Sequence, residues 1–136
     1  MAKRRGKKSV DHAQFIKYRK TAEHFYNASK DSKELEYWTA AGVLIVHSAI
    51  AYADALCVKL SGQKSTGENH EDVIYLLEKA VADSKGKNKA VNQLKRIIEE
   101  KTKVSYLGEL YSPSQTGEMW RRLERFRGWA ISLLDR

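Results

Sequence analysis

A 27-residue stretch, from Glu34 to Leu60, is apolar or small around nearly its whole circumference when it is wound as a helix. A helix without a polar face must be buried, so the stretch predicts the central helix of a bundle. Three polar residues interrupt it, namely His47, Ser48 and Asp54. A buried polar group without a partner costs about 1–3 kcal/mol. These residues therefore need partners, and they are the first candidates for a functional site.

The rest of the chain predicts four further helices, because apolar residues recur at three- and four-residue spacing. We expect them over residues 11–29, 69–85, 88–104 and 113–134, with an irregular aromatic turn over residues 105–111. Asn69 is an expected N-cap, and Ser112-Pro113-Ser114-Gln115 combines an N-cap, an N1 proline and an N3 glutamine. With one proline and no alternating strand pattern, the predicted fold is all-α. It is an up-and-down bundle of about five helices around the long apolar helix.

The charge of the chain is concentrated at its N-terminus. The net charge is +8 over 136 residues, a length that suits one domain. We expect a basic disordered tail over residues 1–9 and a single domain over residues 10–136. Such a tail binds polyanions through counterion release or simply keeps a protein soluble. Its basic residues are Lys3, Arg4, Arg5, Lys7 and Lys8.

Cysteine content and hydropathy indicate a cytoplasmic protein. Cys57 is the only cysteine, so no intramolecular disulfide forms. The N-terminus has no apolar signal-peptide region. Residues 40–60 approach the length of a membrane span, but His47, Asp54 and Lys59 interrupt them, and a mid-membrane aspartate costs about 2.5–3.5 kcal/mol. We therefore expect no membrane partner.

Familiar catalytic motifs do not match. The segment from Gly62 to Gly67 has the composition of a P-loop but lacks its spacing and follows a helix. The histidines have no metal-ligand spacing, so we expect no metal and no cofactor. Cys57 and the serines have no local base, which argues against nucleophilic catalysis.

His47 and Asp54 lie on one stripe of the central helix, two turns or about 10.5 Å apart, so they cannot bond to each other. One interpretation is a satisfied core histidine and a carboxylate that tethers a lysine or arginine. The other is a polar patch that lines a groove or the seam of a dimer.

Three further residues have both a functional and a structural interpretation. His70 opens a predicted helix, where a phosphate could bind with Lys64 nearby, or where a histidine is simply exposed. Lys101 could join the arginines of the last helix in an anion site, with Tyr106 stacking on a base. Alternatively, the arginines form a salt-bridged surface and the tyrosine packs in the bundle.

The chain resembles the HEPN family, named for its occurrence in higher eukaryotes and prokaryotes. The resemblance covers residues 10–134 and is carried by residues 40–56, by Asn69-His70-Glu71-Asp72-Val73 and by residues 101–106 with the aromatic last helix. It is closer to the branch found beside minimal nucleotidyltransferases than to the ribonuclease toxins. The resemblance implies a dimeric bundle with a polar cleft that binds nucleotides or RNA, with family positions at Asp54 and His70.

Ribonuclease members of that family use an arginine, four to six residues and a histidine, usually on a late helix. Arg19 and His24 have this spacing here, but on the first predicted helix. The resemblance therefore favours binding over catalysis.

We expect a non-catalytic, dimeric HEPN-like module that binds a nucleotide or RNA and works with a nucleotidyltransferase partner. The alternatives are a metal-independent endoribonuclease of the toxin or defence type and a purely structural dimerisation module. The residues expected to line the ligand cleft are His47, Asp54, His70, Lys101 and Tyr106.

Overall fold

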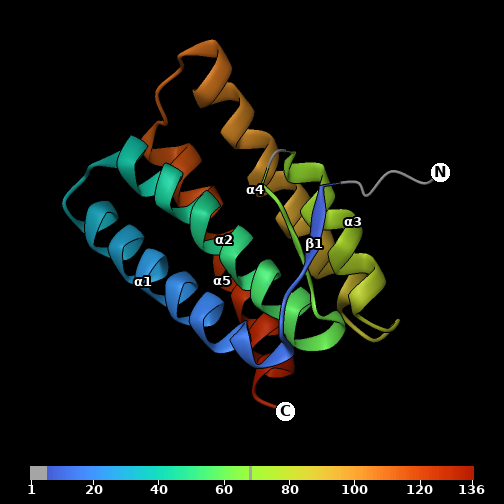
Figure 1. Ribbon diagram of the computed structural model, residues 1–136. Coiled ribbons are helices and arrows are strands. Elements are labelled where there is room, and N and C mark those ends of the chain that lie inside the picture. The colour runs from blue at the N-terminus through green and yellow to red at the C-terminus, as the bar shows by residue number, and fades with distance from the viewer. Residues whose placement is uncertain (1–5, 68) are drawn as a thin grey trace.

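The chain folds into an all-α bundle with one small sheet (Figure 1). The structure is a computed structural model that describes residues 6–67 and 69–136, with the side chains of residues 104–107 outside the description. The helices are α1 (Phe15–Glu34), α2 (Trp38–Ser61), α3 (His70–Ala80), α4 (Lys87–Leu107) and α5 (Pro113–Leu134). A short 3-10 helix, η1 (His12–Gln14), precedes α1, and the strands are β1 (Lys7–Ser9) and β2 (Gln63–Ser65).

Helix α2 is the centre of the bundle, as the apolar stretch predicts. Fourteen of its 24 residues are buried, and it contacts each of the other four α-helices. Its length and hydropathy would allow it to span a membrane, but 78% of the relevant window is buried inside the protein. The apolar circumference is thus accounted for by packing against helices.

The predicted boundary between the first two helices is wrong by about five residues. Helix α1 runs on to Glu34, because no helix-breaking residue follows Ser29 and the carbonyl of Asp31 accepts a hydrogen bond from the Leu35 amide at 3.0 Å. The chain then turns at Glu36, whose φ is +64°. The first residues of the 27-residue stretch therefore belong to α1 and the turn.

The predicted starts of α3 and α5 are confirmed, whereas two helix ends are wrong. The Asn69 side chain caps α3, and Ser112 and Gln115 form a reciprocal capping box on α5. Helix α3 ends at Ala80, earlier than expected, and the Lys87 ammonium binds the carbonyls of its last turn. Helix α4 extends to Leu107, so residues 105–107 are helical instead of forming an irregular turn.

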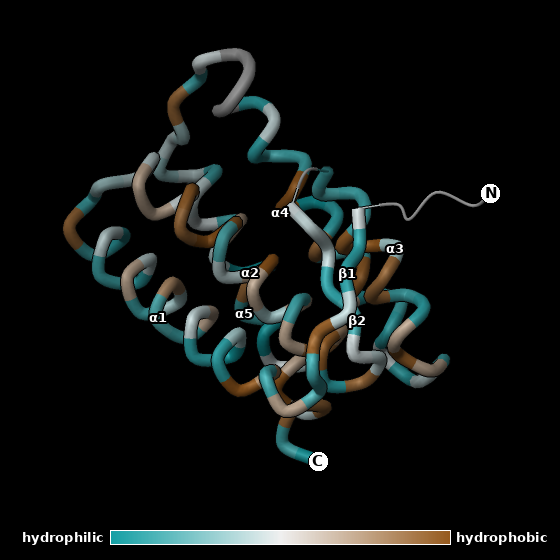
Figure 2. Tube along the Cα trace, viewed as in Figure 1, coloured by the Kyte–Doolittle hydropathy of each residue, from teal (hydrophilic) through white to brown (hydrophobic). Residues whose placement is uncertain are grey.

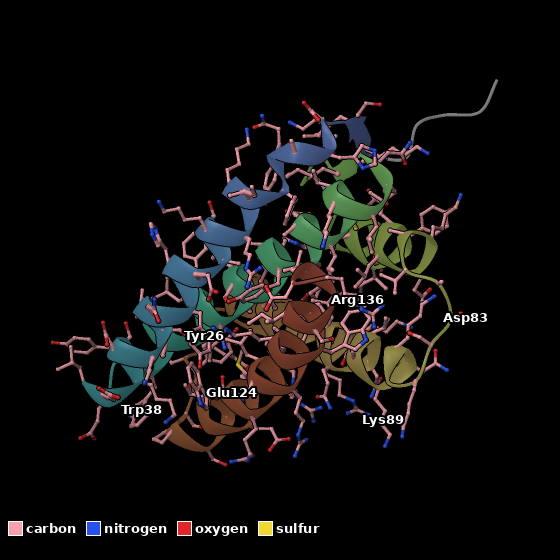
Figure 3. The ribbon with its side chains drawn as sticks, turned by 90° about the horizontal axis from the view of Figure 1, so that it is seen from below. Tyr26, Trp38, Asp83, Lys89, Glu124 and Arg136 are labelled. Atoms are coloured by element: carbon pink, nitrogen blue, oxygen red, sulfur yellow. The ribbon has the colours of Figure 1, made fainter. Side chains whose placement is uncertain are left out.

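A partly buried polar network joins α1, α2 and α5. The Tyr52 hydroxyl donates to Glu23, and Arg127 donates to both, at 2.8 Å to the hydroxyl and 3.0 Å to the carboxylate. Farther along the same interface the Tyr26 hydroxyl donates to Glu124 at 2.7 Å, and Figure 3 shows these two residues side by side. Because every member is partnered, the network fixes the register of the three helices.

The small sheet corrects the prediction of a disordered tail over residues 1–9. Lys7, Lys8 and Ser9 pair antiparallel with β2, so at least this part of the tail is ordered. Backbone bonds from Val10 to Gly62 and from Thr66 to Gly6 extend the pairing at both ends. Figure 2 shows β1 as largely hydrophilic, which explains why alternation of apolar residues did not predict this strand. Lys3, Arg4 and Arg5 lie outside the described residues.

Candidate anion-binding groove

Two of the predicted site residues meet at the mouth of a groove between α3 and α4. Lys101, on α4, places its Nζ 2.8 Å from Nε2 of His70, the first residue of α3. The Asn69 cap sets the start of α3 and thereby the position of His70. Burial and the Lys101 ammonium both lower the pKa of His70, because a second positive charge is disfavoured beside the first. Burial and the Lys101 charge thus favour the neutral form of His70.

His47 faces the same lysine from α2. Its ring packs against Phe25, with ring centroids 5.5 Å apart, while the residue as a whole is exposed. Partial burial of the ring and the positive charge of Lys101 lower the pKa of His47. The positive charge of His47 in turn contributes to the lowered pKa of His70. Three helices thus bring His47, His70 and Lys101 together, as the sequence predicted for these three residues.

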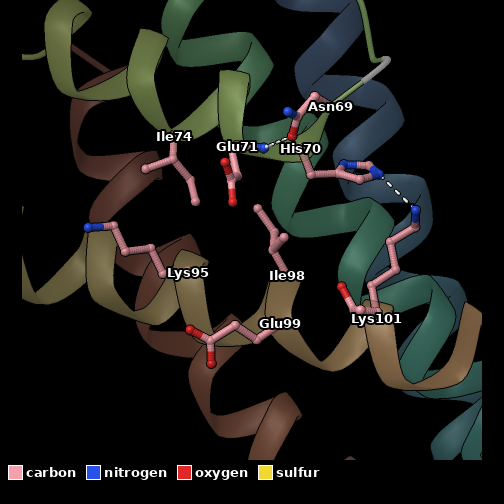
Figure 4. Close-up of a pocket in the computed structure, with 9 residues that line it drawn as sticks. Asn69, His70, Glu71, Ile74, Lys95, Ile98, Glu99 and Lys101 are labelled. Carbon is pink, nitrogen blue, oxygen red and sulfur yellow. Dashed lines mark hydrogen bonds between the residues drawn. The ribbon is translucent and has the colours of Figure 1, made fainter. Parts of the chain in front are cut away.

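The groove itself has an apolar floor and a charged rim, and its volume is about 660 Å³. Figure 4 shows Ile74 of α3 and Ile98 of α4 projecting into it, with Glu71 on one wall and Lys95 and Glu99 on the other. This volume lies within the range of small-molecule sites, in which an apolar surface holds the ligand and a few polar groups orient it.

Sequence reasoning missed Glu71, Ile74, Lys95 and Glu99 as groove residues. Each has an ordinary explanation in the sequence, as a helix N-terminal acid, a core residue or a solvated charge. The available signal was the short connection between α3 and α4, which makes the two helices antiparallel neighbours. Their opposed faces follow only from the three-dimensional packing.

Asp54 does not line this groove, so the single predicted cleft is wrong. Its position seven residues after His47 places it farther along α2 and beneath the β1–β2 sheet. There its Oδ2 lies 3.7 Å from Nζ of Lys64, which confirms the expected cationic partner. Lys64 also donates to the Ser65 carbonyl at 2.8 Å, so it is held near Asp54 and does not accompany His70.

The environment of Asp54 is strongly desolvated. Only 7% of the residue is exposed, and its Oδ1 is buried without a hydrogen-bond partner. Burial raises the pKa of Asp54 to about 6, although the nearby charges of Lys64 and Lys8 act in the opposite direction. Burial and the same carboxylate raise the pKa of the Cys57 thiol, which disfavours the nucleophilic thiolate.

Three arginines of the last helix, Arg121, Arg122 and Arg127, form ion pairs. Arg121 and Arg122 both contact Glu118, at 2.6 and 3.1 Å, which confirms the salt-bridged surface that their spacing indicated. On α1, Arg19 pairs with Asp135 at 2.6 Å. The arginine of the Arg19 and His24 pattern therefore serves a structural contact. The side chain of Tyr106 lies outside the described residues.

Comparison of the chain with models of protein families, with curated proteins and with solved structures finds no match. Within residues 6–67 and 69–136 no group of three histidine, cysteine or acidic side chains is placed to hold a metal ion. The groove and the two histidines beside it are therefore the features of the described structure that bear on function.

Proposed function

We propose that the chain is a helical module that binds a nucleotide or RNA through a phosphate held at His70 and Lys101. The observation that carries the proposal is the 2.8 Å approach of the Lys101 ammonium to the His70 ring, at the mouth of a groove of mononucleotide size. An anion here accepts hydrogen bonds from the Lys101 ammonium and favours the protonated form of His70, so the two groups together bind it better than either would alone. The base would lie against Ile74 and Ile98.

The proposal includes the wider expectations that follow from the HEPN-like sequence, namely a cytoplasmic homodimer that works with a nucleotidyltransferase partner. Exposed apolar side chains near the start of α2 support self-association. Leu35 is 64% exposed and Tyr37 is 62% exposed. Leu110, which is 77% exposed, lies beside Tyr111, whose amide donates to Thr39 of α2. Light scattering over a dilution series tests the dimer independently of the ligand.

Binding should be measured by calorimetry with a nucleoside monophosphate and with a short single-stranded RNA. Replacing Lys101 removes charge-assisted hydrogen bonds worth about 1.5–3 kcal/mol, so Lys101→Gln should weaken binding at least about tenfold. Lys89→Gln is the matched control, because it removes the same charge from an exposed position in the first turn of α4. We expect less than a twofold effect from this control.

Equal weakening by both substitutions would show that binding depends only on net charge and would overturn the proposed site.

The same RNA should be recovered intact after incubation with the protein. Cleavage that disappears in His70→Gln would instead support the endoribonuclease alternative, with His70 as the acid or base.

A further inference from the structure

The contact between His70 and Lys101 constrains the proton of the histidine. An ammonium group has three hydrogen-bond donors and no acceptor. With Lys101 charged, the 2.8 Å contact therefore needs an unprotonated Nε2 on His70 as the acceptor. The contact therefore corresponds to a neutral His70 whose only proton is on Nδ1.

The other charged groups around His70 come from three helices. Lys101 on α4 and His47 on α2 both lower the pKa of His70. Glu71 on α3 and Glu99 on α4 line the groove, yet among the described residues neither forms an ion pair with His70 or Lys101. Burial of the ring, together with the charges of Lys101 and His47, thus favours the neutral form of His70.

We propose that the contact between His70 and Lys101 is a latch that opens when a phosphodiester binds, and that His70 takes up one proton as it opens. This inference rests on the proposed function, whose site it shares. The proton comes from solvent and goes to Nε2, which then donates to a phosphate oxygen. Lys101 transfers its hydrogen bond from His70 to the same phosphate group, and no covalent bond is made or broken in the ligand.

The latch makes binding depend on pH in a defined direction. The anion raises the pKa of a histidine that was lowered in the free protein, so protons are taken up between the two values. Affinity should therefore fall as the pH rises through this interval, by up to about tenfold per pH unit for one full proton. Neutral pH would favour release and mild acid would favour capture.

The test is calorimetry at pH 6.5 in two buffers that differ in ionisation enthalpy. The probe is an oligouridylate without terminal phosphates, because its phosphodiesters and bases keep the same charge between pH 5 and 8. We expect the heat of binding to differ between the buffers in proportion to the protons taken up. His70→Gln keeps a hydrogen-bonding side chain that does not titrate, so it should bind with most of this difference removed and only the smaller share of His47 left. His24→Gln, an exposed change on α1, should retain it.

The outcomes separate this inference from the proposed function. Binding without proton uptake by the native chain would overturn the latch and leave the proposed function standing. Proton uptake of undiminished size in His70→Gln would also overturn it. Absence of binding would overturn both. If His70→Gln does not fold, the imidazole NMR signals of the native protein decide, since the latch requires His70 to become protonated when the oligouridylate is added.

Discussion

Helix α2 carries two polar residues seven positions apart, His47 and Asp54, and their surroundings differ completely. Asp54 is sealed beneath the β1–β2 sheet beside Lys64, with one oxygen unpartnered. His47 is open to solvent and faces Lys101. The comparison shows that polar residues on a shared helical stripe need not share a site. What covers each turn of the helix decides whether the residue serves the fold or remains available to a ligand.

The largest expected effect concerns the sealed region. The pKa of Asp54 rises from 3.8 to about 6 on folding, so its ionisation opposes folding. The stability linked to its protonated form is complete below pH 3.8 and is lost as the pH rises through about 6, a total of roughly 3 kcal/mol. In urea unfolding, Asp54→Asn should therefore gain stability relative to the native protein as the pH rises from 4 to 7, by up to this amount. A difference that stays constant with pH would contradict the account of Asp54.

The ion pair of the sealed region gives the second prediction. The Lys64 charge lowers the pKa of Asp54, in opposition to burial. Lys64→Met should therefore raise the pKa of Asp54 above about 6, as measured by the carbon NMR signal of its carboxyl group. The pKa values of His47 and His70 should not change. A shift of either histidine in this variant would show that the two regions are electrostatically connected.

The open region should respond to His47→Gln in ligand binding. His47 is exposed and lies beside the groove, so its contribution is that of a surface charge, about 0.5–1 kcal/mol. We expect binding of the oligouridylate to weaken about threefold at pH 6 and less at pH 8, where the histidine is neutral. Fluorescence titration at the two pH values measures this, and an equal loss at both would argue for a role in packing.

The smallest expected effect sharpens the comparison most. Asp54→Asn should change the affinity for the oligouridylate by less than about twofold, because the carboxylate does not line the groove. The thermal stability of the same variant at several pH values provides the control that the substitution has acted. A large loss of affinity would restore the single cleft that the sequence suggested.

The sequence was sufficient for the parts of the structure that depend on local chemistry. Periodicity identified the all-α bundle and its central helix, and the capping residues Asn69 and Ser112 marked two helix starts. It also selected His70 and Lys101, which are in contact, and His47, which lies near enough for the Lys101 charge to lower its pKa. It did not separate Asp54 from them, because only the pairing of β1 with β2 determines what covers that turn of α2. Three-residue strands leave too little periodicity to be recognised.

The groove residues could not be predicted from the sequence for a related reason. Glu71 and Glu99 are charged residues on helices, and nothing in their spacing distinguishes a groove wall from a solvated surface. Their common position depends on how α3 and α4 approach each other. The predicted role of Tyr106 stays a prediction.

The most direct test of the account is an NMR titration of the native protein with the oligouridylate at pH 6.5. The imidazole signals of His47 and His70 should move together, and those of His70 toward the protonated form, while the carboxyl signal of Asp54 stays in place. If the histidine signals remain unchanged while binding saturates, or if Asp54 moves with them, the distinction between an open binding region and a sealed structural one is wrong.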